Sequence, residues 1–301
     1  MKRKFIGRVK DYKFIRWFLF WITVRKKRRH YLERDIKKMH AELSSLRCSM
    51  QQMLEKLECY STLTALQIKH MRTSDVYARL HHPEVFEKYR GIHRGRDIVI
   101  VGAGPTLDAY TPIPDAIHIG VNRTYQCEKL SLDYLFAQDG GPVTEVPELT
   151  NYRRGKCRKF FGVHPMMSIM QISEAYVTAN DAEKYYFYNA PPADPAYFVP
   201  LDIAHQPFLC SYSVIACAFQ FALWCQPRRI YLVGCDCSSA GYFKGDSGIC
   251  AQGLPTDELR QEWKCLAEFA KRCYRDIEII SINPVGLRGL FKDLDTNKEE
   301  E

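Results

Sequence analysis

The stretch Asp97-Ile98-Val99-Ile100-Val101-Gly102-Ala103-Gly104-Pro105-Thr106-Leu107 decides the fold. Four consecutive β-branched residues predict a short strand that is buried on both faces, and two glycines and a proline end it. Gly102 and Gly104 let backbone N–H groups approach an anion. Pro105 is typical of the first turn of a helix, whose positive dipole end would face the same anion. The stretch therefore predicts a strand, a phosphate-binding turn and a helix, with a nucleotide as the expected ligand.

The glycine spacing does not support ordinary NAD binding. The dinucleotide fingerprint has a third glycine three residues after the second, and Leu107 stands at that position. A tight turn that binds no ligand is the alternative interpretation of the two glycines.

The basic charge of the chain is concentrated near its beginning. Residues 1–40 contain fifteen Lys/Arg and three Asp/Glu, a net charge of +12, whereas all 301 residues together carry +8. The remainder therefore carries −4 and is long enough for one α/β domain. The twelve cysteines include no CxxC pair, and no signal peptide is evident. We expect reduced thiols in the cytoplasm, with no disulfide framework and no metal site.

Residues 1–30 predict a helix that lies on a membrane surface. Their apolar centre, Trp17 to Val24, has eight residues, whereas a spanning helix needs about twenty. Arg16 precedes this centre and five Lys/Arg follow it at 25–29, as in interfacial helices on anionic lipid. We expect a basic aromatic anchor, peripheral on the inner face of the plasma membrane. The alternatives are a partner-binding helix and a nucleic-acid tail; the aromatic residues argue against nucleic acid.

Residues 31–60 predict a coiled coil. Apolar residues recur at alternating spacings of four and three, so that one seam of the helix stays apolar and must meet another helix. We expect a homo-oligomer through residues 32–57, with the number of chains open; packing of the helix back onto the globular domain is the alternative. The seam consists of Leu32, Ile36, Met39, Leu43, Leu46, Met50, Met53 and Leu57.

The rest of the chain predicts a helical linker over 61–96, an α/β domain over 97–291 and an acidic, frayed tail over 292–301. Alternating strand and helix patterns indicate a Rossmann-like, mostly parallel sheet with helices on both faces. The expected strands are 98–101, 116–121, 134–137, 159–163, 185–188, 230–233 and 277–282, and the main helices are 212–224 and 256–274.

Polar residues follow three of these strands, where ligands of parallel sheets bind. They are Asn122-Arg123, Gln138-Asp139 and Asp236-Cys237-Ser238. Each alone is also typical of a turn. Together with the glycine turn, they predict a ligand site at one crevice.

Four separated motifs carry a resemblance to known proteins. They are Gly102-Ala103-Gly104-Pro105-Thr106-Leu107, Val121-Asn122, Ser211-Tyr212-Ser213-Val214 before the helix 216–223, and Ile230-Tyr231-Leu232-Val233-Gly234-Cys235-Asp236. Together they resemble the bacterial sialyltransferases that use CMP-sialic acid, within a wider group that includes motility-associated glycosyltransferases and hydroxymethylpterin pyrophosphokinase. The resemblance covers about residues 97–290 and excludes the anchor and the coiled coil.

The resemblance implies a donor-nucleotide site. The glycine turn with its hydroxyl residue and the asparagine after the second strand would contact the nucleotide, the loop 211–213 would enclose the sugar nucleotide, and Asp236 would lie near the cytosine or ribose. The implied donor-binding residues are Gly102, Gly104, Pro105, Thr106, Asn122, Gln138, Asp139, Ser211, Tyr212, Ser213, Asp236 and Ser238.

The resemblance does not supply a general base, because the family's histidine, shortly before its C-terminal helix, is missing from residues 253–258. Asp257 or its neighbour Glu258 lies near that position, and Asp257 is the candidate base. The alternative is that these acids only stabilise a helix N-terminus. His164 and His205 are rival bases on loops.

The leaving-group side also departs from the family. Ser238 stands where the family has the first of two tyrosines that stabilise the departing phosphate, and Tyr242 lies near the second. Lys244 beside it would neutralise the same charge, so Tyr242 and Lys244 are candidate catalytic residues. Leu209 replaces an arginine of the family, so recognition of a sialic acid carboxylate by that group is not supported.

The leading hypothesis is a membrane-associated glycosyltransferase of surface glycan synthesis. It would move a sugar from a nucleotide donor, for which CMP is the expected nucleotide, to a saccharide or lipid-linked acceptor without a required cofactor. One alternative is Mg²⁺-dependent diphosphate transfer from ATP, as in the pterin enzyme, with Asp139 and Asp236 as the metal ligands. The other is a non-catalytic nucleotide-binding scaffold.

Overall fold

The computed structural model describes residues 2–61, 65–138, 149, 151–163, 174–188, 199–210, 212–245 and 256–296. The chain forms two compact units, Met1–Ser61 and Thr62–Glu301. The first is a single helix and the second is built on a sheet.

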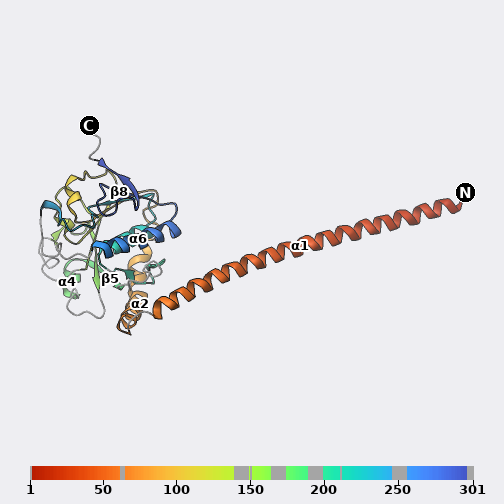
Figure 1. Ribbon diagram of the computed structural model, residues 1–301, viewed down its shortest axis with the longest axis horizontal. Helices are drawn as coiled ribbons and strands as arrows, with labels where there is room; N and C mark the ends of the chain where they lie inside the picture. Colours follow the sequence, from red (N-terminus) through yellow and green to blue (C-terminus); the bar gives the residue numbers. More distant parts are fainter. Residues whose placement is uncertain are drawn as a thin grey trace. The chain divides into compact units, whose positions relative to one another are not determined.

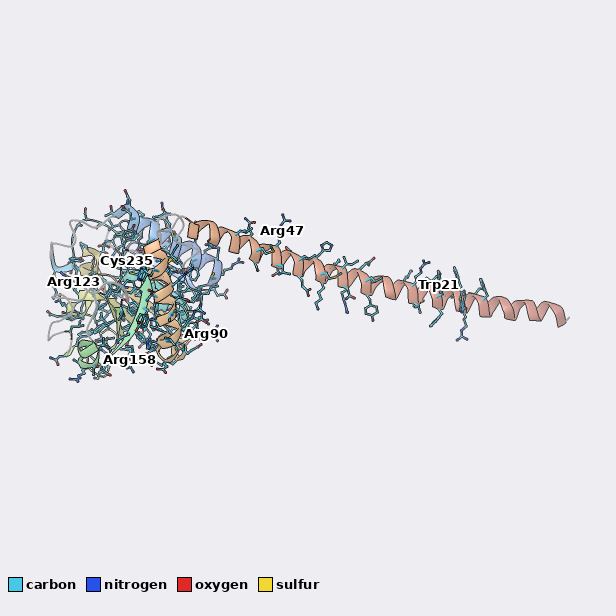
Figure 2. The ribbon with its side chains drawn as sticks, turned by 90° about the horizontal axis from the view of Figure 1, so that it is seen from below. Trp21, Arg47, Arg90, Arg123, Arg158 and Cys235 are labelled. Atoms are coloured by element: carbon cyan, nitrogen blue, oxygen red, sulfur yellow. The ribbon has the colours of Figure 1, made fainter. Side chains whose placement is uncertain are left out.

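Helix α1 runs without interruption over Lys2–Ser61, so the residues predicted as anchor and as coiled coil lie on one helix (Figure 1). Its side chains, Trp21 and Arg47 among them, project outward (Figure 2). The predicted seam is 47–62% exposed at Leu32, Ile36, Met39, Leu43, Leu46 and Met50; the side chains of Met53 and Leu57 lie outside the described set. In the part of the chain that the structure describes, no helix has the length and apolar character to span a bilayer.

Over the residues that the structure describes, a parallel sheet of nine strands forms the centre of the second unit. The strands follow the order β6-β5-β4-β3-β2-β1-β7-β8-β9, and every neighbouring pair is parallel. This arrangement confirms the predicted Rossmann-like α/β class. The strands are β1 (Asp97–Val101), β2 (Ile117–Val121), β3 (Tyr134–Ala137), β4 (Arg158–Val163), β5 (Ala182–Tyr188), β6 (Phe208–Leu209), β7 (Arg229–Val233), β8 (Glu278–Ile282) and β9 (Lys292–Leu294).

Strand β1 lies between β2 and β7, and its apolar residues 98–101 are fully buried. Because side chains alternate along a strand, Val99 and Val101 face one side of the sheet and Ile98 and Ile100 the other. The uninterrupted β-branched run is therefore explained by burial on both faces, as predicted.

Helix α5 (Ile215–Trp224) covers one face, and every one of its residues is buried. Phe221 packs against Phe136 of β3 and Phe160 of β4, with ring centroids 5.3 and 5.2 Å apart. Helix α6 (Thr256–Cys273) packs on α5, where the rings of Phe219 and Trp263 meet edge to face at 5.3 Å.

Short elements cover the other face. They are the 3₁₀ helices η2 (Pro105–Ala109) and η3 (Asn122–Gln126) and helix α4 (Glu174–Ala179). Leu107, Tyr125 and Val177 from these elements join Val99 and Val101 in one hydrophobic cluster. The sheet is thus enclosed between two apolar layers.

The segment predicted as a helical linker over 61–96 is part of the globular unit. Helix α2 (Ala65–Phe86), followed by the 3₁₀ helix η1 (Glu87–Tyr89), packs against β5. Ser74 Oγ donates to the Phe187 carbonyl at 2.9 Å, and Phe86 is fully buried. The globular unit therefore begins before residue 97, where we predicted the domain boundary.

His82 of α2 fixes this packing with both ring nitrogens. Nδ1 donates to the Ile203 carbonyl at 2.8 Å, and Nε2 accepts the Tyr186 backbone N–H at 2.8 Å. Burial lowers the pKa of His82 to about 4. The neutral ring satisfies both contacts, whereas a protonated Nε2 would face another donor.

Two local predictions are corrected. The helix expected after the glycine turn is only the five-residue η2, because Pro112 and Pro114 follow shortly after it and oppose helical extension. A helix dipole therefore contributes little at the turn. The predicted frayed tail begins with β9, which pairs with β8, and Asp295 accepts two hydrogen bonds from Arg288 at 2.9 and 3.0 Å.

Candidate functional site

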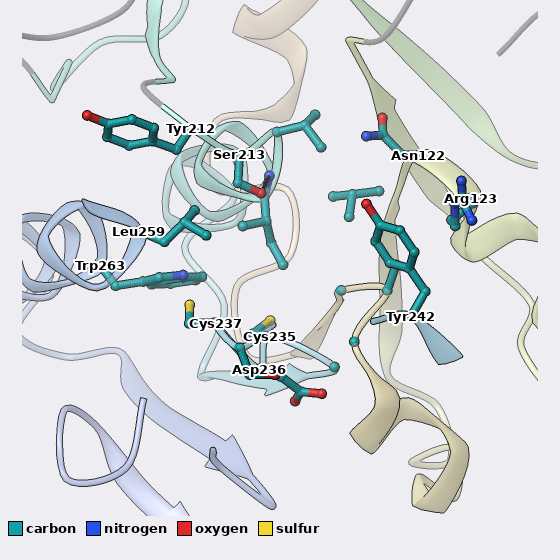
Figure 3. A pocket seen from close by; sticks show the side chains of 18 of the residues that line it. Asn122, Arg123, Tyr212, Ser213, Cys235, Asp236, Cys237, Tyr242, Leu259 and Trp263 are labelled. Atoms are coloured by element: carbon teal, nitrogen blue, oxygen red, sulfur yellow. Dashed lines mark hydrogen bonds between the residues drawn. The ribbon is translucent and has the colours of Figure 1, made fainter. Parts of the chain in front are cut away.

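A cavity of about 470 Å³ lies at the carboxyl ends of β1, β2 and β7 (Figure 3). From β1 the chain builds the sheet outward on one side through β2 to β6, and then continues on the other side of β1 with β7. The strand order therefore reverses between β1 and β7. Parallel α/β sheets bind their ligands at such a reversal.

The two glycines of the turn serve close packing. The Gly102 N–H donates to the Val233 carbonyl at 2.7 Å, and the Gly104 N–H donates to the Gly234 carbonyl at 2.8 Å. A Cβ atom at Gly102 would overlap the Gly234 carbonyl oxygen, and one at Gly104 would overlap the Asp236 carboxylate. Both amides that we expected to bind a phosphate are thus used by β7 and its extension. Glycine is required here because the two strand ends nearly touch.

Asp236 and Thr106 form a clamp below the cavity. The Thr106 N–H donates to Asp236 Oδ2 at 2.9 Å, and the Thr106 hydroxyl donates to Oδ1. Asp236 is 6% exposed; burial raises the pKa of its carboxyl group, and the two bonds from Thr106 oppose that rise. Asp236 lines the cavity, whereas Thr106, predicted to contact the donor, holds the carboxylate instead.

Asn122 and Arg123 follow β2 and both line the cavity. Asn122 has a left-handed backbone with φ of 44°, a conformation that asparagine tolerates better than most residues. Its Oδ1 atom accepts the backbone N–H of Gln138 at 3.4 Å, so the ends of β2 and β3 are tied together.

Two buried thiols orient the carboxamide of Gln138. Cys210 Sγ donates to Oε1 at 3.0 Å, and Nε2 donates to Cys217 Sγ at 3.4 Å. Burial raises the pKa of Cys217 well above its ordinary value. Gln138 lines the cavity in an orientation that these thiols set.

The Tyr242 ring stands beside the glycine turn. The next residue, Phe243, is 3% exposed, and its N–H donates to the Ala103 carbonyl at 3.0 Å. The Arg123 guanidinium stacks on the Tyr242 ring, with Cζ 4.4 Å from the ring centroid. In Figure 3 the two side chains lie together at the cavity.

Lys244 does not join Tyr242 in the cavity. Its Nζ donates to the Gln126 carbonyl at 3.1 Å and lies 3.5 Å from Glu128 Oε1. Its backbone is left-handed, with φ of 61°. Because Phe243 is buried and the chain turns at Lys244, the side chains of Tyr242 and Lys244 lie on different sides of the loop.

Helices α5 and α6 form the opposite wall. Tyr212 and Ser213 precede α5, and Leu259 and Trp263 come from α6. Asp257, the candidate base, lies outside the lining set; its side chain is 92% exposed and 3.8 Å from Arg260. It matches the alternative that we gave, an acid in the first turn of a helix.

The two cysteines beside Asp236 also line the cavity. Burial raises the pKa of Cys237 to about 12 and that of Cys235 well above its ordinary value. Both thiols stay protonated at neutral pH and are poor nucleophiles in that form. Among the described residues, no group of three or more His, Cys, Asp or Glu side chains is arranged to hold a metal ion.

The cavity brings together most of the predicted residues. Those that line it are Gly102, Gly104, Asn122, Gln138, Tyr212, Ser213, Asp236, Ser238 and Tyr242. Pro105, Thr106, Lys244 and Asp257 do not line it. Asp139, Ser211 and His164 lie outside the described residues. His205 pairs with Asp202 on an exposed loop, at 3.0 Å, and is not part of the lining.

Several lining residues were not among the predicted donor-binding or catalytic residues. Arg123 directly follows Asn122, and its position after β2 was the available signal. Leu259 and Trp263 lie on the apolar stripe of α6, which gives no signal beyond that of core packing. Cys235 and Cys237 flank Asp236, and their thiols were expected only to be reduced.

Comparisons with known proteins concern the fold alone. No protein family and no curated protein matches the sequence. A MAf glycosyltransferase from Magnetospirillum magneticum AMB-1 is 13% identical over 74% of this chain and 38% of its own, with a TM-score of 0.44. The monofunctional α-2,3-sialyltransferase Cst-I from Campylobacter jejuni is 16% identical over 62% of this chain and 75% of its own, with a TM-score of 0.32. This chain spans less than half the length of the first.

Proposed function

We propose that the globular unit binds a nucleotide sugar in this cavity and transfers the sugar to a saccharide or lipid-linked acceptor. One observation carries the proposal: the four motifs that resemble sialyltransferases, more than a hundred residues apart at their extremes, contribute to the lining of a single cavity. Gly102 and Gly104, Asn122, Ser213 and Asp236 represent these motifs. The cavity volume also lies in the range of small-molecule sites, about 300 to 1,000 Å³.

The lining has the polar groups that orient a nucleoside. The Asn122 amide and the Ser213 hydroxyl suit a base or a ribose, and the Asp236 carboxylate is held in one orientation by Thr106. In the proposed reaction, the bond between the anomeric carbon and the phosphate oxygen breaks, and its electron pair stays on that oxygen. The acceptor oxygen forms the new bond and its hydroxyl proton is released.

The base that takes this proton is unassigned. Among the described lining residues, Asp236 alone has a carboxylate or imidazole side chain, and both of its oxygens accept hydrogen bonds from Thr106. We therefore propose Asp236 as a binding residue. The earlier candidates Asp257 and His205 lie outside the lining set.

A thermal-shift screen tests the proposal. CMP, a CMP-linked sugar, and ATP with Mg²⁺ are added separately; a ligand at a hundred times its Kd stabilises a protein by about 2.7 kcal/mol. We expect a shift with CMP and its sugar conjugate, and turnover of the conjugate without added metal. A shift with ATP and Mg²⁺ alone would favour diphosphate transfer, and binding without turnover would favour a scaffold.

The Asn122→Gly variant tests whether the nucleotide binds in the cavity. Glycine keeps the left-handed backbone of residue 122 without strain, so this change removes the side-chain amide together with its bond to the Gln138 N–H. We expect a smaller shift with CMP. Asn151→Ala, an exposed position outside the cavity lining, is the control and should retain the wild-type shift.

We also propose that α1 attaches the protein to an anionic membrane surface. Its aromatic residues are exposed, with Trp17 at 60% and Phe20 at 69%. Phe14, Phe18 and Trp21 stack in sequence along one side of the helix, and Arg25 lies 4.6 Å above the Trp21 ring. Aromatic rings next to cations are the composition that binds the headgroup region of anionic bilayers. A peripheral position on the inner face of the plasma membrane follows from this proposal.

The exposed seam of α1 supports self-association. Apolar side chains from Leu32 to Met50 keep the four–three spacing of a coiled coil on a continuous helix, and they are about half exposed in the single chain. We propose a second copy of α1 as the partner that covers them.

A further inference from the structure

We propose that Arg123, stacked on Tyr242, binds the phosphate group of the donor nucleotide. This inference rests on the proposed function and assigns the anion-binding role to a residue that neither the motifs nor the resemblance marked. From sequence we had given that role to the glycine amides and to Lys244. The structure uses the glycine amides and the Lys244 side chain elsewhere.

The position of Arg123 comes from the end of β2. Strand β2 neighbours β1, so residues directly after it stand beside the glycine turn. The left-handed backbone at Asn122 turns the chain into η3, and both Asn122 and Arg123 line the cavity. Arg123 thus extends from a strand end of the central sheet, which is a rigid base for a binding group.

The Tyr242 ring is fixed against the same turn. Gly241, with φ of 97°, allows the sharp bend before it, and buried Phe243 follows it. The backbone N–H of Phe243 binds the Ala103 carbonyl at 3.0 Å, and that of Lys244 binds Asp108 Oδ2 at 2.9 Å. Two hydrogen bonds therefore hold the Tyr242 loop to the residues around the glycine turn.

The stack leaves the guanidinium suited to an oxyanion. With Cζ 4.4 Å from the ring centroid, the aromatic face supports the cation by cation–π attraction. The N–H groups of an arginine point outward in the guanidinium plane and match two oxygens of a phosphate. A stacked arginine also loses less side-chain freedom on binding than a mobile lysine.

The charges around the cavity favour the binding of an anion next to Arg123. Among the described lining residues, Arg123 supplies a permanent positive charge and Asp236 the carboxylate. The oxygens of Asp236 accept hydrogen bonds from the Thr106 N–H and hydroxyl, so Thr106 is the hydrogen-bond partner of this carboxylate. A phosphate next to the glycine turn would lie near Arg123, and Arg123 would stabilise the negative charge that the phosphate gains as the sugar departs.

Affinity measurements on nucleoside and nucleotide pairs test the inference. Cytidine and CMP form one pair, adenosine and AMP the second, and CMP-sialic acid adds a sugar carboxylate. For the pair that binds, Arg123→Gln should weaken binding of the monophosphate about 10- to 100-fold, the usual range for a hydrogen-bonded charged group, and leave nucleoside affinity within about twofold. Arg79→Gln, which removes an arginine from an exposed ion pair on α2, is the control and should change neither affinity.

Variants of Tyr242 distinguish the effect of ring stacking on Arg123 from the effect of the phenolic hydroxyl. Tyr242→Phe keeps the ring under the guanidinium and should retain monophosphate affinity, whereas Tyr242→Leu should lower it in part. A loss of affinity with Tyr242→Phe equal to that with Tyr242→Leu would assign the effect to the phenolic hydroxyl. Arg123→Lys keeps the charge and should recover only part of the affinity.

Several outcomes would overturn the inference. Wild-type monophosphate affinity in Arg123→Gln excludes a phosphate contact, and a loss confined to CMP-sialic acid assigns Arg123 to the sugar carboxylate. A parallel loss for nucleoside and monophosphate means that Arg123 supports the cavity structurally; thermal unfolding of the ligand-free variant identifies such a defect. If neither pair binds the wild type, the proposed function itself fails, and this inference fails with it.

Discussion

Replacing Thr106 with valine should destabilise the globular unit and make its stability depend differently on pH. Valine keeps the β-branched shape of threonine but removes the hydroxyl that donates to Asp236 Oδ1. The backbone N–H of residue 106 still donates to Oδ2 at 2.9 Å. A hydrogen bond to a charged group contributes about 1.5 to 3 kcal/mol, and Asp236 is too buried for water to replace it fully. We therefore expect a loss of about 2 kcal/mol at pH 8, where the carboxyl group is ionised.

The loss should shrink as the pH falls. Burial already raises the pKa of Asp236 above its unfolded value, so the folded state takes up a proton at a higher pH than the unfolded state. Without the threonine hydroxyl the folded pKa rises further. The variant therefore gains stability relative to the wild type as Asp236 becomes protonated, because the neutral carboxyl group depends less on the missing donor.

Urea unfolding of the full chain, followed by near-UV circular dichroism at pH 8 and pH 5, measures both effects. Thr73→Val is the matched control, because its hydroxyl makes an exposed bond to the Lys69 carbonyl at 2.8 Å; it should change stability by less than about 0.5 kcal/mol. A loss below that limit in Thr106→Val at pH 8 would refute the clamp. A loss of the same size at both pH values would refute its dependence on the charge of Asp236.

Further changes test the packing, the helix and the pH response. An unfolded histidine binds a proton below about pH 6.5, whereas folded His82, with a pKa of about 4, does not. The free energy of unfolding should therefore fall by about 3 kcal/mol as the pH is lowered from about 6.5 to about 4. His82→Gln should flatten this part of a urea-unfolding pH profile. Gly104→Ala should lower the unfolding free energy by about 1 to 3 kcal/mol, because its Cβ overlaps the Asp236 carboxylate; an unchanged midpoint would contradict the close packing. If α1 self-associates as proposed, light scattering should show that Leu43→Lys lowers the oligomer mass and that Ser44→Lys, outside the seam, does not. Phe20→Ser should reduce binding to vesicles that contain phosphatidylglycerol; equal binding to pure phosphatidylcholine would argue against an electrostatic attachment.

The sheet was predictable where burial leaves a strong pattern. Strands β1 and β3 were located to within a residue because their runs are apolar and their ends are marked by glycine or polar residues. Strands β6 and β9 have two and three residues, too few for any periodicity, and were missed. The helix after the glycine turn was predicted from Pro105 alone, and the later prolines 112 and 114 outweighed it.

The sequence predicted which chain segments lie at the candidate site, but it predicted less well which way their side chains point. Asn122 and Asp236 were found because they follow β2 and β7, the two strands that flank β1 in the parallel sheet. Lys244 was misassigned because sequence gives no direction to a side chain in a loop. Burial of Phe243 and the left-handed turn at Lys244 send that lysine toward Glu128.

The glycine turn has a different physical role from the one its composition suggests. Gly102 and Gly104 allow the end of β1 to touch the extension of β7, and their amides bind its carbonyl groups. This contact brings Asp236 under Thr106 and fixes the floor of the cavity. Because the Gly102 and Gly104 amides already bind carbonyl groups, we propose that side chains at the rim, and not these two amides, bind the phosphate. Substitution at residue 123 should then alter nucleotide affinity without loosening the floor, whereas substitution of either glycine should damage both.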